Sequence, residues 1–402
     1  MSRLEELIAE LCPDGVEYSS IKNMCKEVIV PMRDRPKIFD GDIPWCRIED
    51  KEGQYFNCSL SGLGVSPRII KDMNLKVFPT GTVICSCSAS LGAYAINTRP
   101  LVTNQTFIGL VCGEQIYNKY LLYYMETQTS KLTSLASTGT IPYISRQKFE
   151  ELTIPVPPLP VQREIVRILD NFTELTAELT AELTARKKQY EYYRDALLTF
   201  GDDVPKLKLS EIATDMYRGA GIKREDVRTK GIPCVRYGEI YTTYNISFDE
   251  CKSHTTLDVV PSPKFFEHGD VLFVITGESV EDIAKSIVYL GNEKCLAGGD
   301  IVVMKHNQSP RYISYALSTT YAQVQKSKGK VKSKVVHANV PSLQKIVIPI
   351  PSIKEQERIA NLLDSFDALC NDLTSGLPAE IAARQKQYEY YRDKLLTFKE
   401  LA

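Results

Sequence analysis

The feature that most constrains this chain is an internal repeat that runs through nearly its whole length. The segment QYEYYRDALLTF at residues 189–200 returns as QYEYYRDKLLTF at residues 387–398, with a single substitution between them. A second match without gaps joins residues 153–172 (TIPVPPLPVQREIVRILDNF) to residues 347–366 (VIPIPSIKEQERIANLLDSF). Self-similarity of this kind identifies the repeated segment as one structural unit. The chain is therefore expected to use one architecture twice.

Weaker matches continue the repeat toward the N-terminal side of each half. DIPWCRIED at residues 42–50 resembles GIPCVRYGE at residues 231–239, and FPTGTVI at residues 78–84 resembles FEHGDVL at residues 266–272. Because the order of the matches is the same in both halves, each half reads as a globular domain followed by a helix. The predicted boundaries are residues 1–154 for the first domain, 155–201 for the first helix, 202–348 for the second domain and 349–402 for the second helix.

Each globular segment mixes two kinds of hydrophobic periodicity. Short apolar runs flanked by Gly, Pro or Asn, such as residues 80–87 (TGTVICSC) and 269–276 (GDVLFVIT), are typical of strands. Residues 118–135 and 310–325 have the three-and-four spacing of helices. The expected fold class is α+β, with two mixed α/β domains, each followed by a long helix, in a chain with an internal pseudo-two-fold duplication.

The two helical segments are predicted to pair with each other. Proline-rich residues such as 155–160 precede each of them and indicate a stiff, extended connector. Apolar residues between positions 165 and 200 recur with gaps of three and four, which is the pattern of a coiled-coil seam. We therefore expect the two helices to form an antiparallel coiled coil. In the second copy, Gly376 and Pro378 are expected to kink or break the helix.

A tetrapeptide, TAEL, occurs twice in the first helix, at residues 176–179 and 180–183. Four added residues turn an α-helix by roughly 400° and lengthen it by about 6 Å, which leaves an apolar stripe only about 40° out of register. Ala, Glu and Leu are good helix formers, so an added unit should remain helical. The tetrapeptide is thus predicted to set the length of the helix while preserving its apolar face.

The sequence lacks the common motifs of catalysis and cofactor binding. It contains no GxxxxGK[ST] loop, no GxGxxG that opens a helix, no HExxH and no GxSxG. Its four histidines stand in unrelated contexts, and no CxxC occurs among its eleven cysteines. We expect no catalytic residue, no metal and no cofactor in this chain. The N-terminal segment lacks the apolar core of a signal peptide, and no apolar run is long enough to span a membrane, so a cytoplasmic protein is expected.

Basic and small polar loops occur at equivalent places in the two domains, although the net charge of the chain is −1. Residues 326–334 (KSKGKVKSK) contain five lysines and no acid. A duplicated chain presents two similar surfaces, and basic loops on both indicate contact with two half-sites on double-stranded DNA. The residues predicted to contact DNA are Arg33, Arg35, Lys37, Thr138, Thr140, Tyr143, Arg146, Arg218, Lys223, Arg224, Lys326, Lys328, Lys330, Lys332 and Lys334.

The near-identity of the two YEYYRD segments indicates a surface that both copies share, since packing alone tolerates hydrophobic substitutions. We therefore predict that Tyr193 and Arg194 bind a partner protein, and that Tyr391 and Arg392 bind a second copy of it. Packing inside the coiled coil is the alternative explanation for the same residues, and the sequence leaves both open.

With this order of segments, the chain resembles the specificity subunits of type I restriction–modification systems. The resemblance covers essentially the whole chain, and it is carried by the order of globular domain, PxP and long helix, present twice. The TAEL units at residues 176–183 point to the type IC branch.

The resemblance implies two target recognition domains, each reading one half of a split, asymmetric DNA sequence. It also implies two methylase subunits docked on the helices, with motor-nuclease subunits joining through the methylase complex. S-adenosylmethionine, ATP and Mg²⁺ would belong to those partners. The alternative function is a non-catalytic scaffold that holds two proteins without DNA, and an apolar patch in place of the basic loops would distinguish it.

Overall fold

The computed structural model describes residues 2–31, 34–88, 90–137, 142–277, 279–280, 283–328, 336–371 and 375–401. These residues form two compact units. Unit 1 contains Met1–Glu178 and Ala382–Ala402, and unit 2 contains Leu179–Ile381. The long helix α7 (Leu159–Leu197) begins in unit 1 and ends in unit 2.

The centre of unit 1 is a six-stranded sheet with the strand order β2-β10-β7-β8-β5-β4. Its two central strands, β7 (Val83–Ser86) and β8 (Tyr94–Asn97), are buried at every position, so they read as short continuous runs instead of alternating patterns. The other strands of this sheet are β2 (Cys25–Ile29), β10 (Phe107–Cys112), β5 (Tyr55–Phe56) and β4 (Lys51–Glu52).

Smaller elements of unit 1 surround this sheet. A three-stranded sheet has the order β6-β3-β9, with β6 (Gly64–Val65), β3 (Ile43–Cys46) and β9 (Val102–Thr103). Strand β1 (Tyr18–Ser20) pairs with β11 (Thr153–Pro155). The helices are α1 (Arg3–Leu11), α2 (Ile21–Met24), α3 (Pro67–Asp72), α4 (Asn118–Thr127), α5 (Thr129–Ser134) and α6 (Arg146–Glu150), with a 3₁₀ turn at Ile48–Asp50.

Unit 2 repeats this plan with a five-stranded and a four-stranded sheet. The first has the order β13 (Ala213–Arg218), β22 (Ile301–His306), β18 (Val271–Val274), β20 (Ser286–Tyr289), β15 (Ser247–Phe248). The second has the order β16 (Ser253–Thr255), β14 (Ile232–Val235), β21 (Cys295–Ala297), β17 (Phe265–Phe266). Two pairs complete it, β12 (Lys206–Lys208) with β24 (Val347–Pro349), and β19 (Thr276–Gly277) with β23 (Val336–His337).

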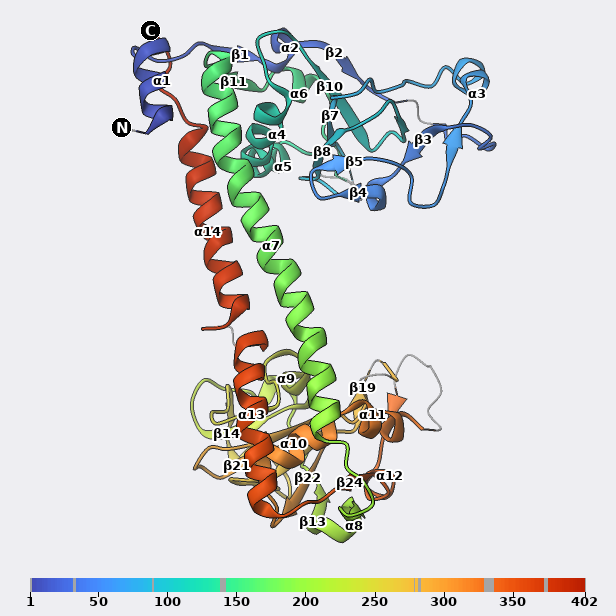
Figure 1. The fold of residues 1–402 in the computed structure, drawn as a ribbon, viewed down its shortest axis with the longest axis vertical. Coiled ribbons are helices and arrows are strands. Elements are labelled where there is room, and N and C mark those ends of the chain that lie inside the picture. Colours follow the sequence, from blue (N-terminus) through green and yellow to red (C-terminus); the bar gives the residue numbers. More distant parts are fainter. Residues whose placement is uncertain are drawn as a thin grey trace. The chain divides into compact units, whose positions relative to one another are not determined.

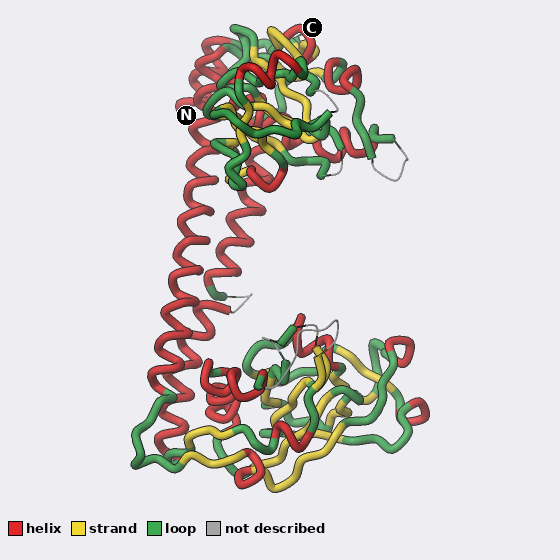
Figure 2. Tube along the Cα trace, turned by 90° about the vertical axis from the view of Figure 1, so that its right-hand side faces the viewer, coloured by secondary structure: helices red, strands yellow, loops and turns green. Residues whose placement is uncertain are grey.

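The helices of unit 2 flank its sheets, and the long helical segments of each unit run along one side of its strands (Figure 2). They are α8 (Leu209–Ile212), α9 (Tyr237–Thr242), α10 (Pro310–Ser318), α11 (Thr320–Ser327), α12 (Val340–Leu343), α13 (Ile353–Asn371), with 3₁₀ turns at Arg224–Asp226 and Leu257–Val259. The predicted fold class, α+β with an internal duplication, is confirmed.

Strand register identifies equivalent residues in the two units. In unit 1, Trp45 of β3 pairs in parallel with Val102 of β9. In unit 2, Cys234 of β14 pairs in parallel with Leu296 of β21. The pairings β10–β2 and β22–β13 are both antiparallel, and each has one bulge near the same end. Trp45 therefore corresponds to Cys234, and two residues further along the chain Arg47 corresponds to Arg236.

The connector before each helix is fixed by a buried glutamine. The Gln162 side-chain amide donates a hydrogen bond to the carbonyl of Pro157 (2.7 Å), and its oxygen accepts from the backbone N–H of Tyr117 (2.8 Å). Gln356 repeats this, donating to the carbonyl of Pro351 (2.8 Å). Both glutamines are fully buried, so each polar atom needs such a partner. The proline-rich connectors thus enter α7 and α13 in the same way.

The second helical arm is divided, as Gly376 and Pro378 predicted. Helix α13 ends at Asn371, and helix α14 (Leu377–Leu395) begins six residues later. Pro378 lies in the first turn of α14, where the missing backbone N–H costs no intrahelical hydrogen bond. The first arm has no such break, and α7 runs through 39 residues.

Inside unit 1, the end of α14 packs beside the start of α7 (Figure 1). Tyr388 and Leu396 of α14 and the turn after it share one buried cluster with Ile165 and Leu169 of α7. Phe172 stacks on Tyr391, with ring centroids 5.6 Å apart and ring planes 23° apart. The start of one arm therefore lies beside the end of the other, which is an antiparallel arrangement.

Inside unit 2, the roles of the two arms are exchanged. Tyr190 and Leu198, at the end of α7, share a buried cluster with Ile359 of α13. Tyr193 stacks on Phe366, with ring centroids 5.8 Å apart and ring planes 26° apart. Each globular domain is thus completed by the last turns of the helix that belongs to the other repeat. The predicted antiparallel pairing of the arms is confirmed within each unit.

Candidate nucleic-acid interface

In unit 1, the loop that follows β2 brings a predicted arginine onto the end of β3. The guanidinium of Arg35 lies 5.0 Å from the ring centroid of Trp45 and 5.7 Å from that of Phe39. Arg47 approaches the same indole, at 5.9 Å. Cation–π contacts hold both cations over a ring that is itself buried. Of the other residues predicted in this loop, Lys37 is exposed, and Arg33 lies outside the described residues.

In unit 2, the equivalent loop lines an open cleft with β14 and the β21–β22 turn. Predicted residues Lys223 and Arg224 are exposed on it, and Arg236 joins them from the end of β14. The residues that line the cleft are Gly221, Ile222, Lys223, Arg224, Arg236, Tyr237, Gly238, Glu239, Thr242, Gly298, Gly299 and Asp300.

Glycines let the walls of this cleft approach each other. A Cβ atom on Gly219 would lie 2.2 Å from the carbonyl oxygen of Gly298, so no other residue fits there without a backbone shift. Predicted residue Arg218 lies at the same turn. Its guanidinium donates to the carbonyl of Gly299 and pairs with Asp300 at 3.0 Å. Arg218 therefore fixes the turn and remains largely exposed.

Arg47 and Arg236 were not selected from the sequence, although the match between residues 42–50 and 231–239 contains both of them. The backbone N–H of Arg47 donates to the carboxylate of Asp50 (2.7 Å), and that of Arg236 donates to Glu239 (2.8 Å). Within the described residues, the Nε of each arginine is buried without a hydrogen-bond partner. The two domains thus hold one cation in the same manner at equivalent positions.

A second pair of predicted segments, residues 137–147 in unit 1 and residues 326–340 in unit 2, also returns to an equivalent place in the two domains. In unit 1, Tyr143 forms a bridge with Ser88. In unit 2, His337 of β23 pairs with Thr276 of β19. Tyr143 is 42% exposed, so its ring is available at the surface. Arg146 is exposed and pairs with Glu150 (2.6 Å), while Thr138 and Thr140 lie outside the described residues.

The lysine-rich segment requires a correction. Lys326 was predicted to contact DNA, but it is buried, and its ammonium donates to the hydroxyl of Ser286 (3.1 Å) and to the carbonyl of Leu317 (2.8 Å). Burial lowers the pKa of this amine to about 7. A side chain held inside unit 2 cannot reach a phosphate, so we remove it from the set. Lys328 is exposed. Lys330, Lys332 and Lys334 lie outside the described residues.

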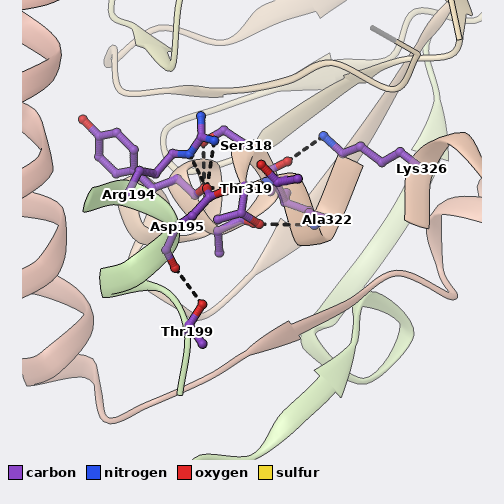
Figure 3. A network of polar contacts seen from close by, with 11 residues as sticks. Arg194, Asp195, Thr199, Ser318, Thr319, Ala322 and Lys326 are labelled. Atoms are coloured by element: carbon purple, nitrogen blue, oxygen red, sulfur yellow. Dashed lines mark hydrogen bonds and ion pairs between the residues drawn. The ribbon is translucent and has the colours of Figure 1, made fainter. Parts of the chain in front are cut away.

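The predicted partner-binding arginines are largely engaged inside the protein. Arg194 pairs with Asp195 at 2.8 Å and lies over the ring of Tyr190, and the side chain of Arg194 is only 13% exposed. Asp195 also accepts the backbone N–H of Thr320 (3.3 Å), at the first turn of α11 (Figure 3). Arg392 repeats this arrangement with its own neighbours, pairing with Asp393 at 2.8 Å and lying over Tyr388.

The tyrosines of the repeated segments face in two directions. Tyr193 and Tyr391, which were predicted from the sequence, each have one face stacked on a phenylalanine and are 41% and 37% exposed. Their neighbours Tyr192 and Tyr390 were not selected, yet they are 70% and 63% exposed. Each neighbouring pair forms an edge-to-face contact. Near-identity of the sequences identified the segment but could not say which tyrosine faces outward.

Two kinds of feature are absent from the described part of the chain. No group of three or more His, Cys, Asp and Glu side chains within it is arranged to hold a metal ion. None of its helices combines the length and the apolar character needed to cross a bilayer.

Comparison with known proteins gives matches along most of the chain. A family model described as the type I restriction modification DNA specificity domain matches residues 13–186 and again residues 236–383. The type I restriction enzyme EcoR124I/EcoR124II specificity subunit of Escherichia coli is 34% identical over 292 residues, covering 70% of each chain.

Solved structures agree with this match in fold. A chain from a structural study of complex assembly and conformational transition of the type I R-M system aligns with a TM-score of 0.65 and 18% identity, covering 96% of this chain and 98% of that chain. The S subunit of a type I restriction–modification system from M. genitalium aligns with a TM-score of 0.52 and 14% identity, covering 95% of this chain and 96% of that chain.

Proposed function

Because the chain belongs to the type I restriction–modification DNA specificity family, we propose that it is the subunit that selects the DNA sequence for such a system. One observation carries the proposal. Two domains with equivalent strand registers present different cationic surfaces at the same place, an Arg35–Trp45–Arg47 stack in unit 1 and a glycine-walled cleft with Lys223 and Arg224 in unit 2. A common framework with different reading surfaces is what recognition of two unlike half-sites requires.

The scaffold alternative is less well supported. It predicts an apolar patch on the globular domains in place of the basic loops. Lys223 and Arg224 are exposed at that place in unit 2, and Arg35 is exposed in unit 1. Cations in such loops bind phosphates and base edges. We therefore propose a bipartite DNA site, with one half-site for each domain and a non-specific spacer between them.

We propose that methylase subunits dock on the tyrosine-rich ends of the two arms. Tyr192 and Tyr390 are the exposed aromatic residues of the repeated segments, and partly exposed tyrosines lie beside them. Aromatic side chains of this kind are frequent anchors of protein interfaces. Two equivalent anchors would bind two copies, and motor-nuclease subunits would join through them. S-adenosylmethionine, ATP and Mg²⁺ would then be bound by the partners, and the assembly would act in the cytoplasm.

Selection from a pool of random DNA tests the proposal, using the chain assembled with its methylase subunits. The expected result is enrichment of one two-part sequence. Replacing Lys223 and Arg224 by Ala should weaken binding, and the slope of log K against log salt should fall by about 0.9 for each phosphate that the variant no longer neutralises. Lys294→Ala is the matched control, because Lys294 is an exposed cation of the same domain outside the cleft. Wild-type protein that enriches no sequence would refute the proposal.

The TAEL units allow a second test of the bipartite site. An additional TAEL after Leu183 would lengthen α7 by about 6 Å. DNA rises about 3.4 Å per base pair, so the spacer should grow by about one to two base pairs. The bases of both half-sites should stay the same, because no loop of either domain changes. Sequencing of the selected sites gives the spacer directly, and an unchanged spacer would contradict the role of TAEL as the ruler.

A further inference from the structure

We propose that Arg47 and Arg236 are the equivalent base-reading residues of the two domains, each presenting the end of its guanidinium to a guanine in its own half-site. The inference rests on the proposed function, because it assigns a base contact within the same DNA-binding surfaces. It concerns residues that neither the loops selected from the sequence nor the basic segments contain.

Their equivalence follows from strand pairing as well as from sequence similarity. Both arginines come two positions after a residue that pairs in parallel with the neighbouring strand, Trp45 with Val102 and Cys234 with Leu296. Each stands at the carboxyl end of its strand, immediately before a helical turn. Two diverged domains therefore deliver a guanidinium to one and the same point of their common framework.

The main chain at this point is fixed in both domains. Asp50 accepts the backbone N–H of Arg47 and also that of Leu60, each at 2.7 Å. Glu239 accepts the backbone N–H of Arg236 at 2.8 Å and the hydroxyl of Ser253. An acceptor that is itself held by a second donor fixes the direction in which the arginine leaves the strand. Base readout needs a fixed side-chain direction, because a bidentate contact between an arginine and a base tolerates little error in position.

The side chains are fixed along their stems, and their ends carry the donors that remain. The Nε atoms of Arg47 and Arg236 are buried, and neither has a hydrogen-bond partner within the described residues. Burial of Nε removes the side-on mode of binding and leaves the two terminal nitrogens as donors. Those two donors match the O6 and N7 acceptors of guanine in the major groove, the most frequent specific contact of arginine.

The surroundings of the two guanidiniums support a ligand-binding role. Arg236 forms no ion pair within the described part of the chain, and it shares an open cleft with Lys223 and Arg224. The carboxylates of Glu239 and Asp300 line the same cleft, but Glu239 accepts the backbone N–H of Arg236 and Asp300 pairs with Arg218. The guanidinium of Arg236 can therefore still meet a phosphate or base acceptor. Arg47 pairs with Glu49 at 2.9 Å, but 52% of the Glu49 side chain is exposed. Surface pairs of this kind are weak, so DNA can displace it.

Differences beside the two arginines account for different half-sites. Arg236 is followed by Tyr237, which is 43% exposed, whereas the residue after Arg47 is Ile48. The facing turn is Gly298–Gly299 in unit 2 and Asn104–Gln105 in unit 1. Each domain would thus read one guanine with its arginine and the adjacent bases with residues that the other domain lacks.

Selection from random DNA by the assembled complex tests the inference. Arg236→Ala should relax a guanine at one position of one half-site, with about a 10- to 100-fold loss of discrimination there. Arg47→Ala should do the same in the other half-site only. Arg236→Gln keeps the stem that packs in the protein, and it should also lose the guanine preference, because glutamine pairs with adenine. Lys294→Ala is the control and should leave both half-sites unchanged.

The outcomes separate this inference from the proposed function. If the wild type enriches no two-part sequence, the proposed function itself fails. If the wild type enriches one and folded Arg236→Gln enriches the same one, only the base-reading role is overturned. Equal weakening on all sequences would also overturn it, because that result describes a phosphate contact. Melting curves of each variant identify any that fail to fold, and Arg236→Gln then serves in place of Arg236→Ala.

Discussion

Tyr388 in unit 1 and Tyr190 in unit 2 occupy equivalent positions on the helix that completes each unit. The hydroxyl of Tyr388 donates to the carboxylate of Glu126 at 2.8 Å. Tyr190 is equally buried, but its hydroxyl has no hydrogen-bond partner among the described residues. The residue of unit 2 that corresponds to Glu126 is Ser318, whose hydroxyl donates to the carbonyl of Tyr315 (2.8 Å). The helix end that packs in unit 1 therefore makes a hydrogen bond to the domain through its tyrosine hydroxyl, and the equivalent hydroxyl in unit 2 makes none among the described residues.

This comparison shows which contacts of the repeated helix are the same in both units and which are not. The apolar contacts at the helix ends are the same in both units, with Leu198 and Leu396 buried and one stacked tyrosine–phenylalanine pair in each. The neighbouring Arg–Asp pairs are the same too, but the hydrogen-bond partner of the buried tyrosine differs. Burial of apolar area needs only volume and shape, whereas a buried hydrogen bond needs a specific partner. The duplicated helix thus fits both domains through its apolar face.

The largest expected change in the free energy of unfolding tests whether each domain is completed by the last turns of the helix from the other repeat. Leu396→Ala and Leu198→Ala should each lower the free energy of unfolding by about 2–5 kcal/mol, the usual cost of such a cavity. Hydrogen exchange measured by mass spectrometry should show Leu396→Ala loosening the domain at residues 14–154 and Leu198→Ala loosening the domain at residues 202–348. Loosening in the opposite domain would contradict the assignment of each helix end to its unit.

A smaller effect should separate the two tyrosines. Tyr388→Phe removes the hydroxyl that donates to the partly buried carboxylate of Glu126 and should cost about 1–3 kcal/mol. Tyr190→Phe removes a hydroxyl that has no partner among the described residues and should change the free energy of unfolding by less than about 0.5 kcal/mol. Hydrogen exchange of the backbone amides near each tyrosine gives the local free energy of unfolding in each variant. Equal costs of the two substitutions would mean that the hydroxyl of Tyr190 makes a hydrogen bond in solution.

The buried amine of Lys326 should make the stability of unit 2 depend on pH above neutrality. The folded chain holds the proton only up to a pKa of about 7, whereas an unfolded lysine holds it to about 10.4. Between these values the unfolded state binds more protons, so the free energy of unfolding should rise with pH, by up to about 1.4 kcal/mol per pH unit. Lys326→Met should flatten this rise, and Lys328→Met is the exposed control. A slope that persists in Lys326→Met would assign it to another group.

The smallest effect concerns Glu126. Burial raises the pKa of its carboxyl, and the hydrogen bond from Tyr388 opposes this. Between the usual carboxyl pKa of about 4.3 and the raised one, the folded state binds more protons, so the free energy of unfolding falls as pH rises. Glu126→Gln should remove this fall and change stability at pH 7 by less than about 1 kcal/mol, since the amide oxygen still accepts from Tyr388. A cost equal to that of Tyr388→Phe would instead show that the ionised carboxylate stabilises the junction.

The sequence by itself determined the plan of the molecule. The repeat established two similar domains and two arms, because identical segments in the same order fold in the same way. The break in the second arm followed from Gly376 and Pro378, because the backbone freedom of glycine and the missing N–H of proline both act locally against a continuous helix. Two short apolar runs, at residues 80–87 and 269–276, were correctly predicted to contain strands, and two segments with three-four spacing, at residues 118–135 and 310–325, were correctly predicted to be helical.

Only the tertiary structure decided which individual polar residues are buried and which are exposed at the surface. Lys326 belongs by composition to an exposed lysine run, yet it lies on the same face of α11 as Ala322, four residues earlier, and that face is buried. Arg47 and Arg236 stood outside every basic segment, and strand pairing set them beside the loops after β2 and β13. The reason is physical: composition describes a segment as a whole, whereas burial and charge contacts depend on which residues from distant segments meet one particular side chain.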